Sequence, residues 1–502
     1  MIQEARKYQA FYTKSIPIVD YMIEKLSLKQ EDRIFEPCGG DGVFIEAILD
    51  RNRYANIDVC ELNNNAFKIL QNKFSHYSAT HIRQSDTLLD SDLIFYSHFG
   101  GIYDKIIANP PYGAWQDYEK RNKLKKIFPD IYAKETYTLF LYRCMEVLKD
   151  GGILSFIIPD TFLSLHMHKS IRKHILTKAK ILELALFPSS FFPGVNFGYA
   201  NLSIITLQKC GNKKECLDNL FNIINGFSNV EQLTDMKREK LKIQSFLQNE
   251  IYRNPEHAFL IANNTKVIET INNTKLKIGD IAHCVTGFYS GNDKEFLQVI
   301  SSDLKNGKNY KLVNVNTIDK DYKNNPDILE GIEGDNHFIP IVKGGNTKYL
   351  KPENWFMNWS KEAVNHYKTD KKARFQNPQF YFKFGIGVPM ISSSNITASL
   401  IENKIFDQSI VGIFPKDIKF TYYLLAFFNS PTCNQLIRTI NPSANNPANY
   451  IKKIPFIMPD KEMLEYITKK VIEILTSIKE KGYFDENSEI QINTIFKSLY
   501  NF

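Results

Sequence analysis

The sequence contains no apolar run that approaches the ~20 residues a membrane-spanning helix needs, and residues 1–6 lack the apolar core of a secretory signal. Cysteine is scarce, with 7 in 502 residues, and no two form a Cys-x-x-Cys pair. A disulfide framework or zinc ribbon is therefore excluded. There is also no internal repeat and no low-complexity tract. These absences predict a cytoplasmic protein that has no membrane segment and no metal site.

The composition is that of a folded protein. Hydrophobic residues make up 43% and aromatic residues 13% of the chain, enough for packed cores. A length of 502 residues predicts about three domains of ~150 residues, or two larger ones. The formal net charge of +8 permits a polyanionic partner without establishing one.

The chain is organised around the segment 106–112. An apolar run, Ile106–Ala108, predicts a buried strand, and Asn109, Pro110, Pro111 and Tyr112 follow it. The two prolines remove two backbone donors and hold Asn109 in an extended conformation. The strand end thus presents an amide, a bare carbonyl and an aromatic ring, which suit an amine that needs acceptors and a flat surface. A plain Pro-Pro turn capped by Asn is the simpler interpretation.

A glycine-rich turn lies upstream. Residues 33–35 predict a strand that ends in Glu36-Pro-Cys38-Gly-Gly40-Asp-Gly42, and a helix is expected from Val43 to about Asp50. Strand, glycine-rich turn and helix form the first unit of a nucleotide-binding α/β sheet. Glycines let the backbone pass close to a ligand, and the turn leads to a helix N-terminus. An ordinary turn between strand and helix is the alternative.

Two further predicted strands also end in acidic residues. Residues 57–60 lead to Glu61, with Asn63 as a helix cap, and residues 81–83 lead to Asp86 and Thr87. Ligands of open α/β sheets bind at the carboxyl ends of the strands, where an acid holds ribose hydroxyls. The alternative interpretation is structural. Glu61 would then be a solvated acid at the start of a helix, and Asp86 would cap a turn. Four candidate groups at successive strand ends indicate a ligand site more specifically than any one of them does alone.

The remainder of this half completes the predicted sheet. We expect helices at 16–26, 137–148 and from 169 to 176, and strands at 153–158, 181–186 and 201–207, the last of the sheet. Phe140 is expected in the core. Phe192 lies in a loop, where it either packs beneath the loop or stacks on a base. The basic segment 120–126 is either a phosphate contact or a mobile solvated loop.

These motifs together resemble the gamma class of adenine-N6 DNA methyltransferases, the TaqI-like enzymes of restriction–modification systems. The resemblance covers about residues 10–209 and implies a Rossmann-like domain that binds S-adenosyl-L-methionine. It places Thr13, Glu36 and Cys38 at the methionine end, Glu61 at the ribose, and Asp86 at the cofactor adenine. Thr87, Pro111 and Phe140 would surround that adenine. Asn109 and the Pro110 carbonyl would hold the target amine, and Tyr112 and Phe192 would stack on the flipped base.

The C-terminal half differs in pattern. From Leu276 onward, short strand-like pieces with Gly and Asn alternate with loops, and helices are expected at about 420–429 and 462–479. This half resembles the target-recognition domains of such methyltransferases and of type I specificity subunits, most closely at 441–455. We therefore predict a catalytic domain at 1–230 and a mixed α+β target-recognition domain at 231–502. Lys-rich loops there suit phosphates, and Asn, Gln and Arg side chains suit base edges.

The predicted function is site-specific methylation of adenine N6 in duplex DNA by a monomer of a type II system, with any restriction endonuclease on a separate chain. The alternatives are a methyltransferase that acts on RNA or on a protein glutamine, and a non-catalytic DNA-specificity module. A fused nuclease is not expected, because there is no Pro-Asp…Glu-x-Lys cluster and no room for a nuclease domain before Thr13.

Overall fold

The computed structural model describes residues 15–112, 117–191, 201–233, 241–262, 264–392, 395–442 and 444–502. The chain forms two compact units, Met1–Leu260 and Ile261–Phe502. Among the described residues, no helix has the length and apolar character to cross a membrane.

The described part of the first unit is built on a nine-stranded sheet in the order β3-β2-β1-β4-β5-β7-β6-β8-β9. β1 to β5 pair in parallel, whereas β7 runs antiparallel to β5 and β6. The central strand β4 (Tyr103–Ala108) is buried along nearly its whole length, as a strand covered on both faces must be. The other strands are β1 (Arg33–Glu36), β2 (Asn56–Glu61), β3 (Thr80–Gln84), β5 (Leu148–Pro159), β6 (Ala179–Phe187), β7 (Leu202–Lys209), β8 (Leu220–Asn225) and β9 (Lys242–Leu247).

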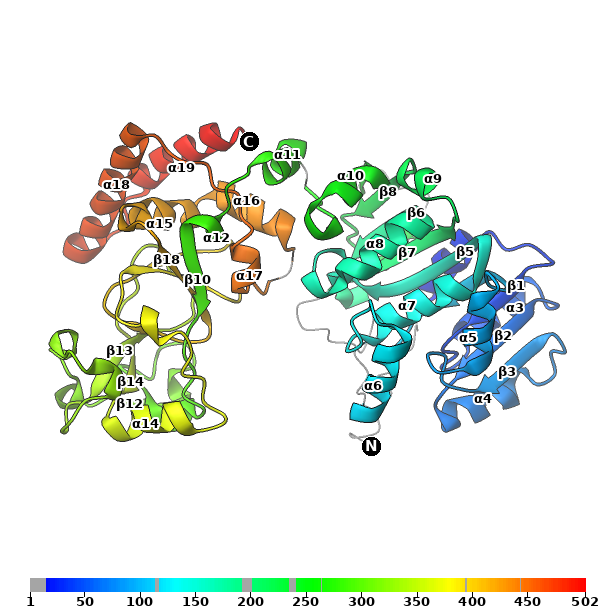
Figure 1. Cartoon of the computed structure of the whole chain (residues 1–502), viewed down its shortest axis with the longest axis horizontal. Helices are drawn as coiled ribbons and strands as arrows, with labels where there is room; N and C mark the ends of the chain where they lie inside the picture. The colour runs from blue at the N-terminus through cyan, green and yellow to red at the C-terminus, as the bar shows by residue number, and fades with distance from the viewer. Residues whose placement is uncertain are drawn as a thin grey trace. The chain divides into compact units, whose positions relative to one another are not determined.

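Helices flank this sheet (Figure 1). In that view α3, α4 and α5 accompany β1 to β3 at one end, and α8, α9 and α10 lie beside β6 and β8 at the other. Asn63 caps α4, because its side chain accepts from the backbone amides of Asn65 and Ala66. The helices are α2 (Ile16–Leu26), α3 (Val43–Arg51), α4 (Asn64–Phe74), α5 (Ser91–His98), α6 (Tyr118–Ile127), α7 (Thr136–Val147), α8 (Lys169–Lys178), α9 (Lys213–Leu217) and α10 (Gln248–Arg253).

The predicted α/β class with a mostly parallel sheet is confirmed, and its strand order reverses direction between β1 and β4. Such a reversal is where open α/β sheets bind ligands. Two local expectations were wrong. β7 is not the last strand, since β8 and β9 follow, and the basic segment 120–126 lies in helix α6 rather than in a loop. The compact units divide at 260/261, and the assignment of a catalytic domain to 1–230 and a target-recognition domain to 231–502 stays a prediction.

The described part of the second unit contains two smaller sheets. One is antiparallel, in the order β10-β18-β15-β16, and the other is mixed, in the order β12-β11-β14-β13-β17. The buried Trp359 lies in the core that the mixed sheet shares with α14. The strands are β10 (Ala282–Thr286), β11 (Leu297–Val299), β12 (Lys311–Leu312), β13 (Phe338–Val342), β14 (Trp355–Asn358), β15 (Gly385–Pro389), β16 (Ser399–Ile401), β17 (Ile405–Phe406) and β18 (Ile410–Pro415).

Helices follow these sheets, with α15 packed on both α16 and α18. The longer helices are α11 (Thr265–Asn273), α14 (Lys361–Thr369), α15 (Thr421–Asn429), α16 (Pro431–Ile440), α18 (Lys461–Thr476) and α19 (Glu486–Tyr500). The predicted mixed α+β character of this half is confirmed. Asn446 lies against the residue that follows β15, since its amide donates to the Met390 carbonyl at 2.6 Å.

Candidate functional site

The turn after β1 is held closely against β2. The Gly39 amide donates to the Cys60 carbonyl at 3.0 Å. Gly42 has a φ of +81° and precedes α3, and a Cβ placed on it would lie 2.5 Å from Cε2 of Phe74. Only glycine fits a position with that φ and that close neighbour. The turn thus leads directly into the N-terminus of α3, and its own amides are bonded within the turn and to β2.

Glu61, at the end of β2, is bound to this turn. Its Oε2 accepts from the Gly40 amide at 2.8 Å, and its Oε1 accepts from the Asn63 amide at 2.6 Å. Burial raises the pKa of Glu61, while the two backbone bonds act in the opposite direction. Each oxygen keeps a second lone pair, so the carboxylate can still accept from hydroxyl groups.

Glu36, at the end of β1, is only 2% exposed. Its Oε2 has no hydrogen-bond partner among the described residues. Burial, and then the neighbouring charges of Asp41 and Glu61, raise the pKa of Glu36 well above its ordinary value. A buried, unpaired carboxyl of this kind is stabilised in its charged form by a cation.

The turn after β3 carries Asp86 and Thr87. The buried Thr87 hydroxyl donates to the Pro37 carbonyl at 2.5 Å, which ties this turn to the glycine-rich one. Asp86 Oδ1 accepts from the Leu88 amide at 3.1 Å, and its Oδ2 lies 2.5 Å from Nζ of Lys120 in α6. Both oxygens of Asp86 therefore have partners.

The turn after β4 lies beside the turn after β1. Cys38 Sγ donates to the Asn109 carbonyl at 3.3 Å, so the turns after β1 and β4 are in contact. The Tyr112 hydroxyl donates to Asn109 Oδ1 at 2.6 Å and to the Ile157 carbonyl at 2.9 Å. Its ring is 7% exposed and meets Tyr137 edge-on, with ring centroids 6.3 Å apart. Burial raises the pKa of Tyr112 well above its ordinary value, so its hydroxyl keeps its proton.

Comparison with known proteins gives this arrangement a context. Residues 7–192 match the model of the Eco57I restriction-modification methylases. This stretch, which holds the turns at the carboxyl ends of β1 to β4, is therefore similar to that family of methylases.

Individual relatives agree with the methylase assignment. Type II methyltransferase M.AccI of Acinetobacter calcoaceticus is 27% identical over 246 residues, which cover 47% of this chain and 42% of that protein. Type II methyltransferase M.HindII of Haemophilus influenzae is 26% identical over 306 residues, 56% of this chain and 53% of that protein. The chain thus spans about half the length of the curated relatives it matches.

The fold extends beyond the methylase segment. A nuclease-deletion mutant of the Type ISP restriction-modification enzyme LlaGI, solved in complex with a DNA substrate mimic, aligns with 92% of this chain and 54% of its own. The TM-score is 0.56 at 13% sequence identity. This likeness shows a shared fold that includes both units.

The first unit brings most of the predicted site residues together. Glu36, Cys38, Gly40, Gly42, Glu61, Asp86, Thr87, Asn109, Pro110, Pro111 and Tyr112 all lie in the turns at the carboxyl ends of β1 to β4. Phe140 is buried on α7. Thr13 and Phe192 lie outside the described residues. The ring of Tyr112 is turned inward, so the stacking predicted for it requires a different orientation.

Sequence reasoning missed two residues of this site. Asp41 contributes to the raised pKa of Glu36, and its position inside the glycine-rich turn is a signal that could have found it. Lys120 pairs with Asp86, and no sequence pattern connects these two residues. Within the described ranges, no group of three or more His, Cys, Asp or Glu side chains could hold a metal ion.

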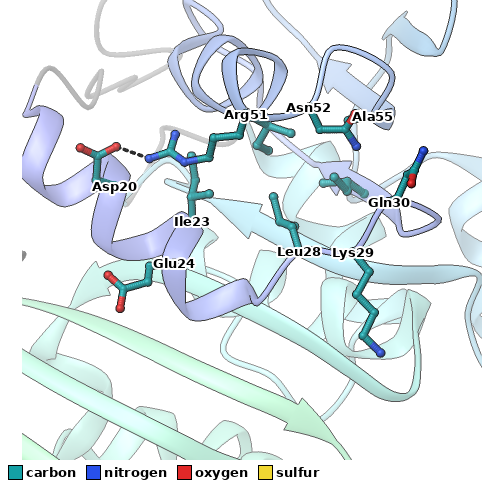
Figure 2. Close-up of a pocket in the computed structure, with 11 residues that line it drawn as sticks. Asp20, Ile23, Glu24, Leu28, Lys29, Gln30, Arg51, Asn52 and Ala55 are labelled. Atoms are coloured by element: carbon teal, nitrogen blue, oxygen red, sulfur yellow. Dashed lines mark hydrogen bonds and ion pairs between the residues drawn. The ribbon is translucent and has the colours of Figure 1, made fainter.

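A cavity of about 800 Å³ lies elsewhere in the methylase unit (Figure 2). Its lining includes Gln30 and Ala55, which precede β1 and β2. It is therefore at the amino ends of the strands, opposite the turns described above. Asp20 and Arg51, which both line the cavity, form an ion pair that Figure 2 marks with a dashed line. We assign the site by the chemistry of the strand ends rather than by the size of this cavity.

Proposed function

We propose that this protein transfers a methyl group from S-adenosyl-L-methionine to the exocyclic N6 amine of an adenine flipped out of duplex DNA. It would serve as the modification enzyme of a type II restriction–modification system. The observation that carries the proposal is the contact between Cys38 and the Asn109 carbonyl. It joins the glycine-rich turn, suited to a nucleoside cofactor, to the Asn-Pro-Pro-Tyr turn, suited to an amine.

The residues of the first two turns fit the cofactor. Glu36 has an unpaired, buried oxygen that a cationic methionine end would neutralise. Glu61 is fixed by backbone amides and has lone pairs left for the ribose hydroxyls. Asp86 can accept from the cofactor's adenine amine, within walls that Thr87 and Phe140 help to form. When bound, S-adenosyl-L-methionine supplies an electrophilic methyl group on a sulfonium centre.

The third turn fits the target amine. An adenine amine is a weak nucleophile, because its lone pair is delocalised into the ring. Acceptance of its two hydrogens by Asn109 Oδ1 and the Pro110 carbonyl favours a pyramidal nitrogen with a localised lone pair. No general base is then needed before transfer, and the surplus proton leaves to water afterwards. Catalysis arises mainly from positioning and fixed dipoles.

The Tyr112 hydroxyl has a defined part in this scheme. It now donates to Asn109 Oδ1, the oxygen that the target amine needs. An amide oxygen has two lone pairs, so the amine can bind beside the hydroxyl or replace it. Replacement would release the ring of Tyr112 to stack on the flipped base together with Phe192, which offsets part of the unstacking cost.

We assign DNA recognition to the second unit. The proposal is supported by the fold shared with LlaGI, which was solved with a DNA substrate mimic, and by the net charge of +8. Duplex DNA is the expected partner of a monomer, and any cognate endonuclease would be a separate chain.

The test is methyl transfer from tritiated S-adenosyl-L-methionine to duplex DNA, to RNA and to protein, followed by mapping of methylated bases. We expect label only in duplex DNA, as N6-methyladenine within one sequence context. The Asn109→Ala variant should bind the cofactor and transfer methyl groups at a rate lowered by about 10²-fold or more. Label in RNA or protein instead of DNA would refute the proposal.

A further inference from the structure

Helix α6 presents a basic surface beside the methylase site. Residues 117–127 contain five Lys or Arg side chains and two carboxylates. Asp117 caps the helix, since its side chain accepts from the Lys120 amide at 2.7 Å. Leu124 is fully buried, and Phe128, directly after the helix, is also buried. Lys123, Lys125 and Lys126 are exposed. The helix is thus anchored on one side and cationic on the other.

Lys120 connects this helix to the cofactor turn. Its Nζ lies 2.5 Å from Oδ2 of Asp86, and the two side chains are 27% and 19% exposed. Asp86 is the carboxylate assigned to the adenine amine of the cofactor. In the structure its acceptor position is filled by a cation from α6.

We propose that α6 contacts the phosphates of duplex DNA and that Lys120 couples this contact to cofactor binding. Asp86 holds Lys120 in the free protein and exchanges it for the cofactor's adenine amine. Lys120 then adds one more cation to the DNA-facing side of α6. This inference rests on the proposed function, because it takes Asp86 as a cofactor ligand and DNA as the substrate.

The partial exposure of Lys120 and Asp86 allows the cofactor's adenine amine to replace Lys120 at Asp86. Ion pairs with partly exposed side chains are weak, because water and salt screen them. Removal of the Lys120 cation should therefore tighten cofactor binding only modestly, by about 2- to 5-fold. Coupling between two binding sites is reciprocal, so the cofactor should increase DNA affinity by the same factor through Lys120.

The first measurement needs no DNA. The affinity of S-adenosylhomocysteine is measured by calorimetry for the wild type, Lys120→Met and Lys126→Met. Lys126 is the matched control, because it is an exposed lysine of the same helix with no ion pair to any described residue. We expect tighter binding in Lys120→Met alone. Weaker binding in that variant would show that Lys120 supports Asp86 structurally, and this would overturn the exchange.

The second measurement follows binding of a short mixed-sequence duplex as a function of salt, with and without S-adenosylhomocysteine. Each phosphate contact contributes about 0.9 to the salt slope. Lys126→Met should lower the slope by about one under both conditions, and Lys120→Met only when S-adenosylhomocysteine is present. Equal effects of Lys120→Met with and without it would refute the coupling.

Failure of the proposed function can be distinguished from failure of the exchange between Asp86 and Lys120. If the wild type transfers no methyl group to DNA, the proposed function fails, whereas the calorimetry still tests the exchange at Asp86. If single-stranded RNA shows the same cofactor-dependent slope as the duplex, α6 is a general polyanion surface, and its assignment to duplex DNA is wrong.

Discussion

In the wild type, the affinity for S-adenosyl-L-methionine should depend on pH. The Glu36→Gln variant should remove most of this dependence. Glu36 is buried, its Oε2 is unpaired among the described residues, and its pKa is raised well above the ordinary value by burial and then by Asp41 and Glu61. In the free protein the carboxyl is therefore protonated at pH values where an exposed glutamate is ionised. The cationic cofactor favours the ionised form, so binding should release a proton.

The sign of the pH dependence follows from this. Below the raised pKa of Glu36, the association constant for S-adenosyl-L-methionine should rise as pH rises, by up to about tenfold per pH unit. Above that pKa it should level off. A charge pair about 4 Å apart at an effective dielectric of 20 is worth at most about 4 kcal/mol. Since desolvation of the cofactor's cation offsets part of this, we expect Glu36→Gln to weaken binding by about 10²-fold on the plateau.

Calorimetry in buffers of different ionisation enthalpy measures both the affinity and the protons released. The control is Glu46→Gln in α3, which removes an exposed carboxylate that pairs with Lys73 on the surface and should leave both quantities unchanged. Glu61 also has a raised pKa, so a shallow pH dependence should remain in Glu36→Gln. If Glu36→Gln bound the cofactor as the wild type does, with the same proton release, Glu36 would not be the counter-ion.

Three further predictions concern neighbouring groups. Asn109→Ala should lower the rate of methyl transfer by about 10²-fold or more, with the calorimetric cofactor affinity within about twofold; an unchanged rate would contradict its role. Glu61→Ala leaves the Gly40 and Asn63 amides without their acceptor, so both cofactor affinity and Tm should fall, and a variant with lower Tm alone would argue against ribose binding. Burial lowers the pKa of His168 from 6.5 to about 3, so the free energy of unfolding should fall as pH drops from about 6.5 toward 3; denaturant titrations should give a flatter profile for His168→Gln, and equal profiles would refute this.

The sequence predicted the strands and turns of the site because each carries a local signal. Buried strands are continuous apolar runs, and Gly, Pro and Asn mark their ends. β4 followed by Asn109 and Pro110 is the clearest instance. Since parallel strands end at one edge of the sheet, the order of these segments was enough to group their terminal residues.

The elements that were missed have no such signal. The strand β9 has largely exposed or half-buried residues along its length, as an edge strand does, so its pattern resembles that of a loop. In α6 only Leu124 is buried, and one apolar residue defines no helical period. These segments are ordered by the cap at Asp117 and by pairing with β8, both of which depend on three-dimensional context.

Residue types at the site can be read from the chain, but their chemical states cannot. A glutamate at the end of β1 is visible in the sequence, whereas its raised pKa depends on burial by segments distant in the chain. Asn109 is likewise visible, but the Tyr112 hydroxyl bound to its oxygen also requires the Ile157 carbonyl from β5. Asp86 is paired with Lys120 only because α6 returns to the turn after β3. Of the acceptors proposed for a ligand, Glu36 thus has a raised pKa, and Asn109 Oδ1 and Asp86 are already bound to donors from the chain itself. Ligand affinity should therefore be governed by exchange: substitution of an internal donor should tighten binding, and substitution of the acceptor should weaken it.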